Sequence, residues 1–231
     1  MQIKVRILDL VNNSYHSCVF LSMRDQIIAH YIRFSNKNGK APVSVFQFCE
    51  DCGLSERQFF DEFSDFEHLQ EEILGDFWKN TVAKLQEQEF YQNTNDAEKF
   101  LAVAYGFFEN LKDQRSFFLN FFGNWSSPKD LFHGFKNFRE VVMKYIDQLD
   151  LPSTDLGVAQ LNKPINKLNS NALYLNLVFV LHYWVKDRSK GFEKTDALIE
   201  KLFTLSFDMM ETNSLKKVID LGKFLVADFK L

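Results

Sequence analysis

The sequence predicts an all-α protein, and three observations support this prediction. Among 231 residues there are only 9 Gly and 4 Pro, so residues that break helices are scarce. Apolar residues recur with a period near that of an α-helix along most of the chain. The 26 Phe provide large side chains for a well-filled apolar interior. Hydrophobic residues make up 46% and charged residues 25% of the chain, which is the balance of a soluble globular protein.

The first residues fit poorly with the rest of the chain. Positions 1–22 show neither a helical stripe nor strand alternation, and Met23 opens a stretch that reads like a natural protein start. The region 1–22 is therefore either an N-terminal arm or the result of a start codon assigned too early. We leave open whether translation begins at Met1 or at Met23.

From residue 25 onward the helical period is clear, and local signals mark where each helix begins and ends. Gly39 and Gly53 are expected to end helices in the left-handed conformation, and Ser44 and Ser55 are expected to cap the next helices along the chain. Because 150–167 contains two prolines and a glycine, we expect a loop there. The expected helices cover 25–36, 45–51, 56–63, 65–89, 97–112, 115–122, 128–149, 170–186, 194–211 and 215–229.

Composition excludes several functional classes. The net charge of −4 gives no overall basic footprint for nucleic acid. Three cysteines do not form a disulfide framework, and no apolar run is long enough for a signal peptide or a membrane span, so we expect a cytoplasmic protein. Phosphate-binding loops and the usual hydrolase motifs are missing, so we expect neither an enzyme nor a cofactor.

Cys49 and Cys52 form a C-x-x-C pair, which by itself suggests a redox or zinc site. Zinc needs further ligands, and the remaining cysteine and the histidines are not suitably spaced. A free cysteine also commonly serves as a small buried side chain. We therefore expect them to be structural and predict no metal site.

Residues 24–74 carry a continuous set of spaced matches to one motif. Ser44-Val45, Phe48, Gly53-Leu54-Ser55, Phe60, Phe63 and Leu69 stand where the helix-turn-helix of the tetracycline-repressor family has T-V, Ile, G-V-S, Tyr, Phe and Leu. The segment thus resembles that family of DNA-binding regulators. The resemblance implies a three-helix helix-turn-helix domain at 23–70, followed by a helical-bundle domain for ligand binding and dimerisation at 71–231.

The resemblance also implies a DNA-binding surface. The residues expected to contact DNA are Ser44, Ser55, Arg57, Gln58 and Phe60. Two departures weigh against tight binding: Phe60 and Phe66 replace side chains that donate hydrogen bonds to phosphate in the family. Between Val43 and Leu69, Arg57 is the only basic residue, against seven acidic ones. Additional positive charge at the edges would come from Arg24, Arg33, Lys37 and Lys40.

The C-terminal part suggests a ligand pocket and a dimer interface. Aromatic residues are too numerous between 105 and 138 for one helix face, and the resemblance implies a cavity for an apolar small molecule in this region. Helices 170–186 and 194–211 each carry two apolar stripes, so one stripe is free to contact a second copy of the chain. The pocket residues are Tyr105, Phe108, Phe118, Trp125, Phe138 and His182, and the dimer residues are Leu198, Leu202, Leu205 and Met209.

The sequence supports two functional hypotheses. The first is a homodimeric transcriptional regulator that binds operator DNA under the control of an apolar small molecule. The second is a protein of the same fold that has lost DNA binding and instead holds a lipid- or isoprenoid-like ligand or a protein partner. The acidic helix-turn-helix and the two phenylalanines favour the second hypothesis. Neither the ligand nor the operator can be named from the residues.

Overall fold

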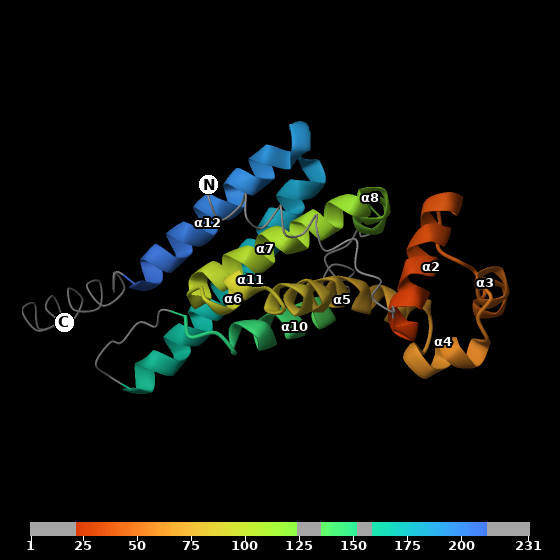
Figure 1. The fold of residues 1–231 in the computed structure, drawn as a ribbon, viewed down its shortest axis with the longest axis horizontal. Helices are drawn as coiled ribbons and strands as arrows, with labels where there is room; N and C mark the ends of the chain where they lie inside the picture. The colour runs from red at the N-terminus through yellow and green to blue at the C-terminus, as the bar shows by residue number, and fades with distance from the viewer. Residues whose placement is uncertain (1–21, 124–134, 152–158, 212–231) are drawn as a thin grey trace, which may run out of the picture. The chain divides into compact units, whose positions relative to one another are not determined.

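A computed structural model of the chain describes residues 22–123, 135–151 and 159–211 (Figure 1). Every regular element in these ranges is a helix, as the sequence predicts. None of these helices has an apolar stretch long enough to cross a membrane. The α-helices are α2 (Met23–Asn38), α3 (Val45–Cys52), α4 (Glu56–Glu62), α5 (Phe66–Gln86), α6 (Glu89–Gln92), α7 (Asp96–Asp113), α8 (Arg115–Gly123), α10 (Lys136–Ile146), α11 (Ala159–Lys186) and α12 (Glu193–Glu211).

These helices belong to two compact units. The first contains the described residues up to Gln92 together with those of Tyr105–Val142, and the second contains Asn93–Ala104 and the described residues from Met143 onward. The residues of α7 and α10 are therefore divided between the units. Each unit has its own buried core.

In the first unit, α2, α3 and α4 form a three-helix group that precedes the long helix α5 (Figure 1). Close helix contacts depend on small residues. A Cβ atom at Gly75 of α5 would lie 1.9 Å from Oδ1 of Asn137 on α10, so any larger residue there would require the Asn137 side chain to move. A Cβ atom at Gly106 of α7 would lie 3.0 Å from Thr81 of α5.

The second unit is organised by α11 and α12, which pack against each other and are joined by the short 3-10 helix η2 (Lys190–Phe192). Such a short connection makes the two helices antiparallel neighbours. The side chain of Asn176 donates a hydrogen bond to the Ser206 hydroxyl across the pair, at 2.9 Å. Both helices bury one side in the core of the unit, through Leu173, Leu177, Val180, Trp184, Ile199, Phe203, Phe207 and Met210.

The connection between α11 and α12 is held by the buried carboxylate of Asp187. It accepts hydrogen bonds from the Ser189 amide at 2.8 Å and from the amide and hydroxyl of Thr195 at 3.0 and 2.7 Å. Burial alone would raise the pKa of Asp187, but these hydrogen bonds outweigh burial and lower the pKa from 3.8 to about 2. The carboxylate is thus charged at neutral pH and caps the start of α12.

One expectation about the elements is wrong. The sequence predicts a loop at 150–167, but α11 already begins at Ala159 and includes Pro164. Pro164 lies in the second turn of α11, just beyond the N–H groups at a helix start that have no partner within the helix, so the helix accommodates it at the cost of one hydrogen bond. The expected N-terminal arm, the first part of the helix 128–149 and the helix 215–229 lie outside the described residues.

Candidate functional site

The turn between α3 and α4 has the geometry of a helix-turn-helix. Gly53 adopts φ 68° and ψ 29°, and its N–H donates to the carbonyls of Cys49 and Glu50, which ends α3. Ser44 caps α3 by accepting a hydrogen bond from the Gln47 amide. At the start of α4, Ser55 and Gln58 form a capping box. The signals read from the sequence therefore act as expected at this turn.

Aromatic side chains hold the three helices together. Phe48 of α3 and Phe59 of α4 are fully buried, and their ring centroids lie 6.1 Å apart at an interplanar angle of 77°. Phe66, at the start of α5, lies 5.4 Å from Phe48 and 5.3 Å from Phe59, in edge-to-face contacts. The resemblance implies a phosphate-binding lysine at position 66, but Phe66 is part of the aromatic core. That use of Phe66 is not visible in the sequence motif alone.

The expected DNA-contacting residues occupy the exposed side of this group, but they are not equally available. Arg57 is exposed and has no ion pair or hydrogen bond among the described residues. The hydroxyl of Ser44 accepts one bond and keeps its own proton for another partner. The Ser55 hydroxyl and Oε1 of Gln58 bind each other, which leaves the amide nitrogen of Gln58 as a donor. Phe60 is 52% exposed and has no polar atom to offer.

Charge on this surface stays predominantly acidic. Of the seven acids between Val43 and Leu69, only Glu62 is partly buried, and its carboxylate lies 4.0 Å from Arg24. Arg24, which the sequence suggests as a source of positive charge for DNA, is instead bound within the protein. Arg33, Lys37 and Lys40 remain exposed. The basic charge available near the motif is therefore smaller than the sequence indicates.

Arg24 ties the helix-turn-helix to α5. Its Nε donates to the carboxylate of Asp76 at 2.7 Å and its Nη2 to that of Glu72 at 2.6 Å. Nη1 lies 3.5 Å from the carbonyl of Glu62 at the end of α4, and the guanidinium sits 4.4 Å from the centroid of the Phe63 ring. One side chain of α2 thus contacts the end of α4 and two acids of α5. The sequence gives no sign of this arrangement, because the partners lie far apart along the chain.

The cysteine pair lies on α3, with Cys49 buried and Cys52 half-buried, and both thiols are free. Burial, aided by Glu56, raises the pKa of the Cys49 thiol. Burial also raises the pKa of Cys52, with Asp51 and Cys49 adding to the effect while Arg33 opposes it. Across the described ranges, no group of three or more His, Cys, Asp or Glu is arranged to hold a metal ion.

The aromatic residues expected to line a pocket are packed together. Tyr105, Phe108, Phe118 and Phe138 are all buried in the first unit. The ring of Phe138 stacks on Phe107 at 5.4 Å, and that of Phe118 meets Phe77 at 5.1 Å. None of the four lines the cavities of about 350, 490 and 770 Å³ that described residues form elsewhere in the protein.

The two other expected pocket residues do not join this cluster in the described structure. His182 is exposed on α11 in the second unit. Trp125 lies outside the described residues.

The residues expected at a dimer interface lie along α12. Leu205 and Met209 are 56% and 61% exposed, and Leu198 and Leu202 are half-buried. On the neighbouring helix α11, Leu175 and Phe179 are similarly exposed. Exposed apolar side chains on two antiparallel helices are typical of a surface that is covered by another molecule.

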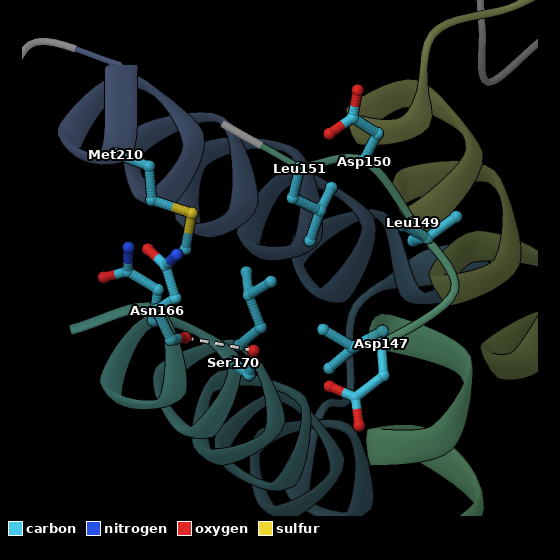
Figure 2. Close-up of a pocket in the computed structure, with 10 residues that line it drawn as sticks. Asp147, Leu149, Asp150, Leu151, Asn166, Ser170 and Met210 are labelled. Atoms are coloured by element: carbon cyan, nitrogen blue, oxygen red, sulfur yellow. Dashed lines mark hydrogen bonds between the residues drawn. The ribbon is translucent and has the colours of Figure 1, made fainter. Parts of the chain in front are cut away.

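The second unit also contains a cavity of about 350 Å³ where the end of α10, the start of α11 and the end of α12 meet. Its deeper wall is apolar and includes the buried residues Ile146, Leu173 and Met210. Figure 2 shows Asp147 and Asp150 at this cavity, together with Ser170, whose hydroxyl donates to the Asn166 carbonyl at 3.1 Å. The lining combines apolar and acidic groups with no basic one, and it includes none of the residues that the sequence predicts for a ligand pocket.

Comparison with known proteins identifies a family through the C-terminal part of the chain. No curated protein gives a significant match to the chain. Residues 99–225, more than half of the chain, match the sequence profile described as tetracyclin repressor-like, C-terminal domain. That match covers the region after the helix-turn-helix and is independent of the motif at 24–74. The chain therefore belongs to the tetracycline repressor-like family.

Proposed function

We propose that this protein is a homodimeric transcriptional regulator that binds operator DNA through α3 and α4 and responds to a small molecule. The observation that carries the proposal is the capped helix α4, which presents Arg57 on an exposed surface without any partner in the described structure. An unpaired guanidinium on a recognition helix is suited to bind a guanine edge in the major groove. The Ser44 hydroxyl is placed at the start of α3, where phosphate contacts are common.

Dimerisation would place two such helices on one operator. The exposed apolar residues of α11 and α12 support a second copy of the chain as the partner, and the family forms dimers of this kind. We expect an interface that is the same on both copies, as twofold symmetry requires. In this arrangement the protein acts by binding and not by catalysis.

The test is a fluorescence-anisotropy titration of the protein with its own upstream DNA over a range of salt concentrations. Replacing Arg57 with alanine should weaken specific binding about ten- to a hundredfold, since one good base contact contributes about 1–3 kcal/mol. A matched control is Arg188→Ala, which removes an exposed arginine from the second unit and should leave binding unchanged. If the unmodified protein retains no DNA at any salt concentration, the proposal is wrong.

A second function is favoured by one specific observation. Val43, Phe46 and Phe60 are exposed apolar residues on the helix-turn-helix, and the exposed charges around them are mostly acidic. Such a surface suits a basic and apolar protein segment better than a DNA backbone. In this alternative the protein keeps the family fold but binds a protein partner or a lipid-like ligand.

The two functions predict different outcomes for one substitution. Phe60→Tyr supplies the hydroxyl that the family uses on phosphate, so a DNA-binding protein should gain affinity for all sequences and a steeper salt dependence. A protein that uses Phe60 in an apolar interface should show no DNA binding before or after the change.

A further inference from the structure

The first unit contains a cavity that is lined by none of the residues expected to contact DNA and by none of the residues expected to form the ligand pocket. It has a volume of about 770 Å³ and is bounded by α2, α5 and the end of α7 with the turn after it. This volume lies in the range of about 300–1,000 Å³ that is typical of small-molecule sites. The cavity therefore lies between a helix of the helix-turn-helix and two helices that come after it in the chain.

The deeper part of this cavity is apolar. Ile28 and Ile32 of α2 lie one turn apart, and Phe77 of α5 also contributes to the lining. Ala29, next to Ile28, is exposed and leaves the cavity open at that point. Ile28 and Ile32 are each only 5% exposed, so an aliphatic chain in this space would contact them and would cover mainly the apolar surface that Ala29 and Phe77 expose to water.

The rim of the cavity is polar and carries more basic than acidic residues. Arg33, Lys37 and Lys84 line it, against Asp25 and Asp113. The carboxylate of Asp25 is already engaged: one oxygen accepts from the amide and hydroxyl of Ser22, and the other lies 3.2 Å from the side-chain nitrogen of Asn80.

Arg33 and Lys37 are exposed, lie one turn apart on α2, and form no ion pair with a described residue. A local excess of positive charge beside an acidic helix-turn-helix attracts an anionic group. The two side chains are close enough along the helix to contact the same head group.

We infer that this cavity binds a small amphipathic acid, with its aliphatic chain over Ile28, Ile32 and Phe77 and its carboxylate at Arg33 and Lys37. The inference rests on the proposed function in one respect, because such a ligand would be the small molecule to which the regulator responds. Its occupant contacts α2 and α5 at the same time. Because α2 packs within the helix-turn-helix, the ligand would restrict movement of the DNA-binding helices relative to α5.

The experiment uses decanoate as the probe and decanol and decyltrimethylammonium as chemical controls, all below their micellar concentrations. Binding to the full chain is measured without DNA by isothermal titration calorimetry, with thermal melting as a second readout. Decanoate should bind and raise the melting temperature by mass action. Decanol should bind about tenfold more weakly, because it lacks the charge-assisted hydrogen bonds, and the cationic probe should not bind.

Three variants locate the site. The double change Arg33→Gln with Lys37→Gln should lower decanoate affinity about tenfold, to the level of decanol. The matched control Lys40→Gln removes a nearby exposed lysine that does not line the cavity, and it should behave as the unmodified protein. Ala29→Trp should fill the cavity and abolish binding of both probes while circular dichroism shows an unchanged helix content.

The inference is overturned if no probe binds, if decanoate and decanol bind equally well, or if either the double variant or Ala29→Trp binds decanoate as the unmodified protein does. None of these measurements contains DNA. Their failure therefore leaves the operator-binding proposal standing. A protein that binds decanoate as expected but retains no DNA refutes only the proposed function.

Discussion

Replacing Arg24 with methionine should destabilise the protein more than any exposed charge substitution in the helix-turn-helix. Methionine keeps much of the volume of the arginine stem but removes the guanidinium from Asp76, from Glu72 and from the carbonyl of Glu62. The side chain of Asp76 is only 8% exposed, so its charge would lose its closest cation without becoming well hydrated.

The expected magnitude depends on the groups that remain around Asp76. Removing one partner of a fully buried ion pair costs about 3–5 kcal/mol. Here Lys79 stays 3.1 Å from the other oxygen of Asp76, and Arg24 is itself about one quarter exposed, so we expect about 2–3 kcal/mol. For a chain of this length each kcal/mol lowers the melting temperature by about 2–4 °C, which gives a decrease of about 4–12 °C.

Thermal melting followed by circular dichroism measures this effect. Arg57→Ala is the matched control, because that arginine is exposed and has no described partner, and its melting temperature should stay unchanged. Adding Asp76→Asn to Arg24→Met should recover part of the loss, since the unpaired buried charge is then removed. A decrease smaller than about 1 °C for Arg24→Met would show that the guanidinium does not hold α2 to α5 as its contacts indicate.

Three further predictions concern other parts of the chain. Because the pKa of Asp187 is lowered to about 2, its charged form stabilises the fold above about pH 4, and this contribution is lost as the pH falls toward 2. Asp187→Asn should therefore lower the free energy of unfolding, measured with urea, by about 1–2 kcal/mol at pH 7 and by little at pH 2. Leu205→Glu with Met209→Glu should convert dimers to monomers in sedimentation at micromolar concentration, and an unmodified protein that is already monomeric contradicts the dimer. Cys49→Ala with Cys52→Ala should change stability by about 1 kcal/mol or less, and stoichiometric zinc in the purified protein would refute their structural role.

The helix-turn-helix was predictable because its signals are local. Gly39 and Gly53 adopt the left-handed conformation, and Ser44 and Ser55 cap the next helices, as expected from short stretches of sequence. The start of α11 was not predictable in this way. Pro164 reads as a loop residue when only its neighbours are considered, but the helix that contains it continues to Lys186 and is anchored by buried residues such as Leu173, Leu177 and Trp184.

Features that depend on tertiary packing were the hardest to predict. A sequence rich in phenylalanine does not reveal whether the rings fill a core or surround a ligand, and Phe118 and Phe138 turn out to be packed against other rings. The partners of Arg24 come from α4 and α5 and are far from it along the chain. The cavity beside α2 was missed for the same reason, because its lining comes from several separate segments.

The acidic residues of the helix-turn-helix do not all carry the same functional meaning. Glu56 and Glu67 lie in the first turns of α4 and α5, and Asp65 caps α5, so these three stabilise helix N-termini and would be favourable whatever the protein binds. Glu50 and Asp51 lie in the last turn of α3, where the helix dipole disfavours negative charge, and that turn contains no basic residue. Helix capping therefore does not account for these two acids. Their charge therefore bears on the choice between DNA and a basic protein partner more directly than the total charge does.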